Sequence, residues 1–313
     1  MHAVTIVDGK LEWREHPDPE PGAGELLVRV EAAGLNAGDL LQVRGLYPAP
    51  PGSPADIPGL EAAGTVVATG PGVTRFAVGD RVMAVVGGGG QAELLVVHES
   101  VALAVPDQLD AAAAGGFPEV FTTAHDALFA QAELGMGEHL CVHAAAGGVG
   151  VAAVQLAVAA GARVTATVRN PDLRDRVAEL GATVIDPDGF GAHGPFDVVL
   201  ELIGGPNLAA DVGALAIGGR ISVIGVGAGA KAEVNLLALM GVRGRIHGST
   251  LRARPLEGKA AAAQAVARHV LPLVARDQLR VPIAATFHMS DAAAAHERFA
   301  AGGKFGKIVL LAD

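Results

Sequence analysis

A glycine-rich segment after a short apolar run is the clearest candidate for chemistry in this chain. The apolar run from Leu140 to His143 predicts a buried strand, and the sequence A-A-G-G-V-G after it predicts a tight turn. Residues Val151 to Ala160 predict an apolar helix that ends at Gly161. A turn without side chains lets a pyrophosphate approach the backbone, and the N–H groups of the helix start supply a positive field. Alanine takes the first glycine position, and an ordinary strand–helix turn is the alternative. The residues predicted to bind a dinucleotide here are Ala146, Gly147, Gly148, Val149 and Gly150.

The end of the next strand indicates which nicotinamide cofactor binds. In NAD-preferring sites a carboxylate about 20 residues beyond the glycines binds the ribose 2′-hydroxyl. Here Arg169 takes that place, with Asn170 beside it and with Arg174 and Arg176 in the helix that follows. An arginine fork binds a 2′-phosphate through charge-assisted hydrogen bonds, so we predict NADPH as the cofactor. For Arg174 and Arg176 the alternative is that they only solvate a helix face.

Two sequence patterns divide the 313 residues. Residues 1–117 consist of short apolar runs between turn signals, which predicts a β-rich domain. From residue 118 the pattern is helical, and from 139 strands alternate with helices. Such alternation predicts a six-stranded, doubly wound Rossmann sheet. Its expected strands are 140–143, 163–168, 183–186, 196–201, 219–225 and 243–248.

The segment after residue 253 is too short for a core of its own. It contains a predicted helix at 257–275, a strand at 283–287, a helix at 291–301 and a last strand at 306–311. We therefore expect an α/β protein with a catalytic domain of residues 1–117 and 254–313 and a nucleotide-binding domain of residues 118–253. Ligands are expected in a cleft between the two domains.

Composition limits the classes of binding partner and the cellular compartment that fit this chain. A formal net charge of −10 argues against a nucleic-acid surface. The single cysteine, Cys141, allows no disulfide framework within the chain, which fits a reducing cytoplasm. The first ten residues are typical of a strand rather than a signal peptide, and no apolar run reaches the length of a membrane span. We expect a cytoplasmic protein without a membrane or nucleic-acid partner.

Five segments together resemble a known family. They are A-G-L-N-A-G-D-L-L-Q-V-R-G-L-Y-P at 33–48, P-G-L-E-A-A-G at 58–64, G-V-T-R-F-A-V-G-D-R-V at 72–82, A-A-A-G-G-V-G at 144–150 and G-S-T-L-R-A-R-P-L-E at 248–257. In this order they are similar to the zinc-free, zeta-crystallin-like quinone oxidoreductases of the medium-chain dehydrogenase/reductase superfamily. The resemblance implies a GroES-like catalytic domain beside the Rossmann domain. It also implies a homodimer, for which residues 242–248 could supply the paired edge strand.

The resemblance also bears on metal binding. Where zinc-dependent relatives carry a Cys and a His ligand, this chain has Asn36 and Leu60, and its single cysteine excludes their four-cysteine lobe. We therefore predict no metal. His139, Cys141 and His143 alternate on one face of a strand and could chelate a metal in another setting. In a central strand covered on both faces we interpret them as core residues.

Without a Lewis acid, hydride transfer to an already electron-poor acceptor is the expected reaction. Charge then develops on the acceptor oxygen, which needs a hydrogen-bond donor. Asn36 is our first candidate, and Tyr47, the only tyrosine, could donate a hydrogen bond or stack on a flat acceptor from its Pro/Gly-rich loop. Asp39 would orient Asn36 or cap the following helix. Structural, gating and packing roles are the alternatives for all three.

The resemblance assigns further residues to the cofactor. Thr123 is similar to a family threonine near the nicotinamide carboxamide, although a helix Thr bonded to its own backbone is the alternative. Independently of the resemblance, Gly204 and Gly225 follow two strands of the predicted sheet and would lie in loops that border the cofactor, with a role as turn glycines as the alternative. Lys304 and Phe305 would close over the cofactor. Relatives carry a Lys and a Tyr that contact the 2′-phosphate, and this chain has Leu173 and Pro187 at those positions. Arg169 would therefore bind the 2′-phosphate with fewer supporting side chains. His125, next to Thr123, is expected on a helix surface or between the domains.

The sequence thus favours an NADPH-dependent, metal-independent quinone reductase. A reductase of enones, enals or enoyl thioesters would use the same cradle with a different entrance, and an NADPH-binding protein without turnover is a third reading.

Overall fold

The computed structural model describes residues 1–312, which form two compact units. The first unit holds Met1–Thr122, Leu251–Gly302 and the chain from Lys307 onward, and the second holds Thr123–Thr250 with Gly303–Gly306. These limits differ from the expected domains at three places. Residues 118–122 and 251–253 belong to the first unit, and 303–306 to the second. The last shift has a direct cause, because Gly306 N donates to Ala146 O at 3.0 Å.

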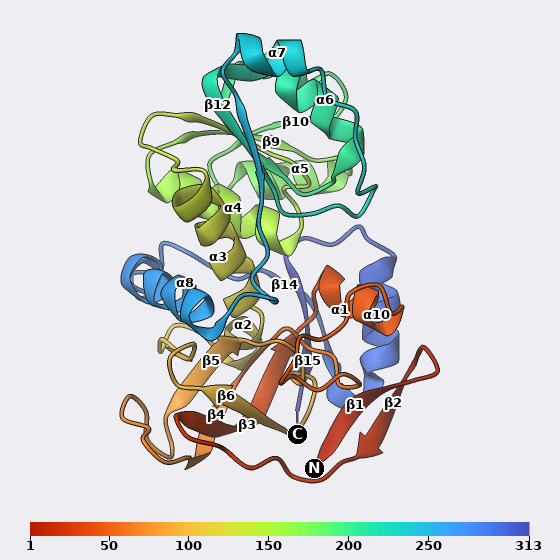
Figure 1. Cartoon of the computed structure of the whole chain (residues 1–313), viewed down its shortest axis with the longest axis vertical. Coiled ribbons are helices and arrows are strands. Elements are labelled where there is room, and N and C mark those ends of the chain that lie inside the picture. Colours follow the sequence, from red (N-terminus) through yellow and green to blue (C-terminus); the bar gives the residue numbers. More distant parts are fainter. Residues whose placement is uncertain (313) are drawn as a thin grey trace. The chain divides into compact units, whose positions relative to one another are not determined.

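The first unit is built on a seven-stranded sheet of order β14-β15-β3-β4-β5-β7, with β6 paired to β3 (Figure 1). Along β3, Leu26, Val28 and Val30 alternate inward into the core, as the period of a half-buried strand requires. A separate antiparallel hairpin consists of β1, His2–Val7, and β2, Lys10–Glu15. The other strands are β3 Glu25–Gly34, β4 Glu61–Thr69, β5 Arg81–Val85, β6 Leu94–His98, β7 Leu103–Ala104, β14 Ile283–His288 and β15 Lys307–Leu311.

The C-terminal segment completes this sheet, as its length predicted. β15 pairs antiparallel with β3 and parallel with β14. The single helix expected at 257–275 is wrong: α8, Leu256–His269, ends before α9, Leu271–Val274. Pro272 supplies no backbone N–H and disfavours helical backbone in the residue before it, so the long helix breaks there. The remaining helices of this unit are α1 Ala37–Val43, α2 Ala111–Gly115, the first part of α3 Pro118–His125, a 3-10 turn Met289–Asp291 and α10 Ala292–Ala300.

The second unit contains a six-stranded parallel sheet of order β10-β9-β8-β11-β12-β13. Strands β9, β10 and β12 of this sheet are labelled in Figure 1. All six expected strands are present, and their order confirms the doubly wound Rossmann topology. The strands are β8 His139–Val142, β9 Arg163–Thr167, β10 Thr183–Ile185, β11 Phe196–Glu201, β12 Leu215–Val223 and β13 Arg245–Gly248. The helical segments are a π-helix Asp126–Gln131, α4 Gly148–Ala159, the 3-10 turn Pro171–Leu173, α5 Arg174–Ala178, the 3-10 turn Phe190–His193, α6 Gly205–Gly213 and α7 Leu236–Gly241.

The core of the second unit surrounds β8, which pairs with β9 on one side and β11 on the other. Leu140, Cys141 and Val142 are fully buried, and so is most of α4. A helix buried on all sides needs no polar face, which explains why Gln155 is the one polar side chain between Val151 and Ala160. Across residues 1–312, no helix has both the length and the apolar character that crossing a membrane demands.

Candidate active site

The glycine-rich turn of the second unit has the geometry of a phosphate-binding site. Helix α4 begins after Gly147, whose backbone is extended and whose position provides no capping side chain. The first N–H groups of the helix therefore remain available as hydrogen-bond donors, at the end of the helix where its dipole is positive. A Cβ on Gly150 would lie 2.6 Å from Ala145 Cα and 2.7 Å from Ala144 O, so only glycine fits where helix and strand meet.

Of the predicted phosphate-binding side chains, Arg169 alone keeps its guanidinium unengaged by other described residues. It is exposed, two residues beyond the end of β9. Arg174 donates from Nε to Val168 O at 3.0 Å and pairs with Asp186. Asn170 Oδ1 accepts from the N–H of Asp172 at 3.0 Å and so caps the next turn. The structure thus gives Arg174 and Asn170 local structural partners.

Two further loops at the carboxyl ends of the strands are shaped by glycine. Gly204 has φ of +112°, and a Cβ there would meet Gly229 O at 2.5 Å. A Cβ on Gly225 would lie 2.5 Å from Leu202 O. Both loops therefore pack backbone against backbone at the end of the sheet where doubly wound folds bind nucleotides.

The segment 303–306 lies along the glycine-rich turn, with Gly147 and Gly306 forming a parallel bridge. Phe305 is buried, and the Arg176 guanidinium carbon lies 4.2 Å from its ring centroid. That cation–π contact packs Phe305 inside the unit, so we no longer expect its ring to cover the cofactor. Lys304 is half-buried beside it.

Thr123 and His125 are both buried on α3. The expectation that His125 lies on a helix surface is wrong for this reason; its ring contacts Phe129 with centroids 5.2 Å apart. Taken together, an uncapped helix start, a turn with no room for a Cβ and an exposed arginine show that the second unit's residues fit a dinucleotide phosphate chain.

In the first unit, Asn36 belongs to a buried network around an ammonium group. Lys307 Nζ donates to Asn36 Oδ1 at 2.7 Å, to Leu35 O at 2.6 Å and to Glu61 Oε1 at 2.6 Å. The amide Nδ2 of Asn36 donates to Glu61 Oε1 at 2.9 Å and to Gly34 O at 3.3 Å. Both amide hydrogens therefore have acceptors already, and Asn36 can donate to a substrate only by giving up one of these bonds.

Asp39 is fully buried and fixes the start of α1. Its carboxylate accepts from the N–H of Asn36 at 2.7 Å and from the N–H of Gly59 at 3.1 Å. Burial raises the pKa of Asp39 to about 6, although these hydrogen bonds and the charge of Lys307 lower it. The structure places Asp39 where it holds the backbone of Asn36.

Tyr47 is held over α1 by an arginine. The Arg252 guanidinium carbon lies 4.8 Å from the Tyr47 ring centroid, and Nη1 donates to Tyr47 O at 2.6 Å. The same side chain donates to Gly87 O at 2.8 Å and to Gln42 Oε1 at 2.5 Å. A Cβ on Gly38 would meet the Tyr47 ring at 3.2 Å, so the ring lies close to the first turn of α1. The Tyr47 ring is thus packed between the Arg252 guanidinium and the first turn of α1.

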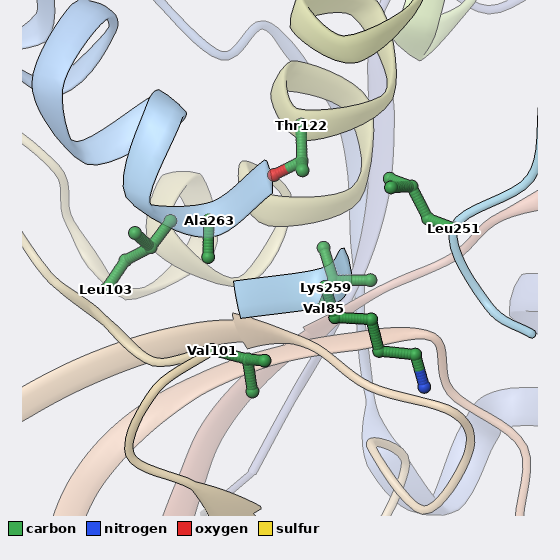
Figure 2. A pocket seen from close by; sticks show the side chains of 7 residues that line it. All are labelled: Val85, Val101, Leu103, Thr122, Leu251, Lys259 and Ala263. Atoms are coloured by element: carbon green, nitrogen blue, oxygen red, sulfur yellow. The ribbon is translucent and has the colours of Figure 1, made fainter. Parts of the chain in front are cut away.

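A small, mainly apolar pocket lies elsewhere in the first unit (Figure 2). Its polar lining comes from Thr122 on α3 and Lys259 on α8. The pocket shares no residue with the predicted catalytic set, and burial lowers the pKa of Lys259. Its full lining is Val85, Val101, Leu103, Thr122, Leu251, Lys259 and Ala263.

The three residues that alternate along β8 do not form one site. His139 lies at the start of the strand, with its Nε2 2.8 Å from Thr165 Oγ1. Cys141 and His143 are buried, and Cys141 Sγ lies 3.9 Å from His143 Nε2. Residues from other elements, Glu201 and Asp211, provide the remaining polar atoms around His143.

Sequence reasoning missed several charged residues at these sites. Glu201 ends the largely apolar strand F-D-V-V-L-E, Lys307 opens the otherwise apolar strand K-I-V-L-L, and Glu61 opens a third strand. A charge inside an apolar strand is costly unless it has a partner, and this could have marked them as members of buried networks.

Comparison with known proteins defines the class. Residues 22–107 match the family "Alcohol dehydrogenase GroES-like domain", and residues 184–310 match "Zinc-binding dehydrogenase". With a Rossmann sheet in the second unit, the chain belongs to the medium-chain dehydrogenase/reductase superfamily, and it is an NAD(P)-dependent oxidoreductase.

Individual relatives sharpen this assignment. A quinone oxidoreductase of Pseudomonas aeruginosa is 36% identical, over 96% of this chain and 95% of that protein. An alcohol dehydrogenase superfamily protein from Novosphingobium aromaticivorans superposes with a TM-score of 0.90 at 30% identity, covering all of both chains. A mycobacterial protein solved in complex with NADPH gives a TM-score of 0.88 at 27% identity, covering 99% of each chain. The resemblance to the quinone oxidoreductase branch is confirmed.

Proposed function

We propose that this protein is an NADPH-dependent quinone reductase that works without a metal. The observation that carries the cofactor choice is Arg169, an exposed guanidinium without a partner among the described residues, at the end of the strand after the glycine-rich turn. A free arginine fork there attracts a 2′-phosphate, whereas an NAD site carries a carboxylate. The acceptor class is supported by the quinone oxidoreductase of Pseudomonas aeruginosa, which aligns along nearly the whole chain.

The donor set of the first unit supports metal-independent chemistry. Leu60 offers no ligand atom, and Asn36 Oδ1 and Glu61 Oε1 both accept hydrogen bonds from Lys307 at 2.6–2.7 Å. A divalent cation bound to these oxygens would lie beside a buried ammonium, and like charges at that distance repel strongly. Lys307 thus provides, at these oxygens, the positive charge that a bound metal ion would otherwise provide.

In the proposed reaction, a bound reduced nicotinamide supplies a hydride to the acceptor. One quinone, one NADPH and one proton give one hydroquinone and one NADP⁺. The second unit would hold the pyrophosphate at the start of α4 and the 2′-phosphate at Arg169. The first unit would orient the acceptor with the Tyr47 ring and the Asn36 amide. Water can deliver the proton, since hydroquinone formation needs no dedicated acid.

The decisive test pairs a cofactor variant with two acceptors. We expect Arg169→Asp to lower the ratio of kcat/KM for NADPH to that for NADH by at least about tenfold, because it replaces attraction for the 2′-phosphate with repulsion. Arg163→Asp, an exposed change at the opposite end of the same strand, is the matched control and should leave the ratio unchanged. An unaltered ratio in Arg169→Asp would refute the NADPH assignment.

The same assay tests the acceptor. Oxidation of NADPH with a small benzoquinone should be faster than with a simple enone. A faster rate with the enone would point to a reductase of unsaturated carbonyls. Tight NADPH binding without turnover of either acceptor would leave a binding protein.

We further propose that the protein is a homodimer formed through the second unit. Strand β13 ends the parallel sheet and has backbone donors and acceptors to offer. Beside it, Ile217 and three residues of α7 are between 67% and 77% exposed, and Gly218 N donates to Val242 O at 2.6 Å, which joins the two segments. Exposed apolar side chains gathered at a sheet edge favour a two-fold symmetric contact. The α7 residues are Leu236, Leu237 and Met240.

A further inference from the structure

A cluster of polar side chains lies inside the second unit at the carboxyl end of its central strands. His143 follows β8, Glu201 ends β11 and Asp211 lies on α6, and each side chain is at most 1% exposed. His143 Nε2 lies 2.9 Å from Asp211 Oδ1 and 3.9 Å from Glu201 Oε2. On the other side of the ring, Nδ1 lies 3.1 Å from Thr167 Oγ1. Burying two carboxylates together is energetically costly and rare, which indicates that this cluster has a role in the protein.

His143 and two of the side chains around it, Thr167 and Glu201, belong to different loops at the nucleotide end of the sheet, and Asp211 lies on the helix that follows one of these loops. His143 itself immediately precedes the turn 144–150. Thr167 ends β9, two residues before Arg169, and Thr167 O accepts from Ala145 N at 3.2 Å. Glu201 Oε1 accepts from Gly204 N at 2.7 Å and from Ile203 N. One imidazole therefore connects the glycine-rich turn, the Arg169 loop and the loop that begins α6.

The charges of the cluster make the imidazole necessary. Among the described residues, Asp211 Oδ2 and Glu201 Oε2 have no hydrogen-bond partner. Burial lowers the pKa of His143, but hydrogen bonds to Asp211 and Cys141 and the nearby negative charge outweigh it and raise this pKa to about 10. Burial raises the pKa of Glu201. Without the imidazolium, the buried carboxyl groups would lose their nearest cation, and Thr167 would lose its link to α6.

We propose that His143 is a positioning residue for the nicotinamide dinucleotide, which sets the spacing of loops 144–150, 168–170 and 202–205 by bridging Thr167 to Asp211. It acts through these loops and does not touch the cofactor. The proposal rests on dinucleotide binding by the second unit, and it is independent of the acceptor and of the 2′-phosphate preference.

Three substitutions separate the two halves of the bridge. His143→Asn places a polar atom near the position of Nδ1, within reach of Thr167, and His143→Gln places one near the position of Nε2, within reach of Asp211. His143→Leu offers neither. The readouts are the Kd of the reduced nicotinamide, measured by its fluorescence, together with kcat and KM. The nucleotide used is whichever of NADPH and NADH binds the wild-type protein more tightly, so a failed NADPH assignment leaves this test intact.

We expect His143→Leu to raise the nucleotide Kd about tenfold, the equivalent of losing one or two buried hydrogen bonds. The Asn and Gln variants should fall between it and the wild type. At saturating nucleotide, kcat should stay within about twofold in all three, because the reacting atoms keep their surroundings. Should the Leu variant not fold, as judged by circular dichroism, the Asn and Gln variants carry the test.

A matched control separates positioning from general stability. Arg220 on β12 is buried in the same unit and donates to Glu138 from Nη1 and Nη2, each at 2.8 Å, at the amino end of the strands. Arg220→Met should lower the thermal midpoint and leave the nucleotide Kd unchanged. Wild-type affinity in His143→Leu, or an equal loss of affinity in Arg220→Met, would overturn the proposal. So would one zinc per chain that is lost in His143→Leu, because a metal would then link the carboxylates.

Discussion

Replacing Lys307 with methionine tests whether its buried ammonium holds the first unit together. Lys307 and Glu61 form an ion pair at 2.6 Å with side chains 4% and 0% exposed. Removing one partner of a buried pair typically costs about 3–5 kcal/mol, since the other charge stays buried without compensation. Methionine keeps most of the volume of the lysine stem, so the loss reports the charge and its three hydrogen bonds rather than a cavity.

The single tryptophan makes this measurable. Trp13 lies on β2 and packs against the core of the first unit, so its fluorescence follows unfolding of that unit in urea. With a slope of about 2 kcal/mol per molar urea, Lys307→Met should lower the midpoint by about 2 M. Adding Glu61→Gln removes the stranded carboxylate and should restore part of the loss. Lys10→Met, at an exposed position of the β1–β2 hairpin that carries Trp13, is the control and should change the free energy of unfolding by less than about 0.5 kcal/mol.

A loss below about 1 kcal/mol in Lys307→Met would refute the reasoning, because it would show that the carboxylate of Glu61 is compensated without the ammonium. A double variant no more stable than the single one would refute the pairing itself.

Three further predictions concern other parts of the chain. Gly150→Ala should raise the nucleotide Kd at least about a hundredfold, because its Cβ would lie 2.6 Å from Ala145 Cα. The control Gly213→Ala, whose Cβ would have nothing within 4 Å, should bind the nucleotide normally and gain up to about 1 kcal/mol of stability. Equal binding by both variants would contradict this prediction. Burial lowers the pKa of His296 to about 4 from 6.5, so the folded state binds this proton less readily than the unfolded chain. First-unit stability should therefore fall as pH drops from 6.5 towards 4, by up to about 3 kcal/mol, and His296→Gln should flatten this slope in urea titrations; parallel slopes would show that another group is responsible. Leu237→Glu should halve the mass measured by light scattering, and a wild type that is already monomeric would rule out the dimer.

The two units differ in how far the sequence could describe them. For the second unit, local rules were sufficient: strands alternating with helices predicted the six-stranded, doubly wound sheet that the structure contains. Pro272 also predicts the break between α8 and α9 from local chemistry, but the helical spacing of the apolar residues continues through it and suggested a single helix.

Side-chain roles at the sites were less accessible. Asn36 was singled out as a hydrogen-bond donor because of its position in the motif, yet its amide is engaged by Lys307, 271 residues away, and by Glu61. Likewise, nothing near Arg174 in the sequence shows that it pairs with Asp186 instead of remaining free for a phosphate.

By itself the sequence determined the class of fold, the glycine-rich turn and the arginine beside it, because backbone conformation and hydrophobic period depend on neighbours in the chain. Only the tertiary structure decided which polar groups already have partners. Lys307 with Glu61 and His143 with Asp211 are brought together by strands and helices distant in sequence. Burial makes such pairings obligatory, but composition and spacing do not say which residues will meet.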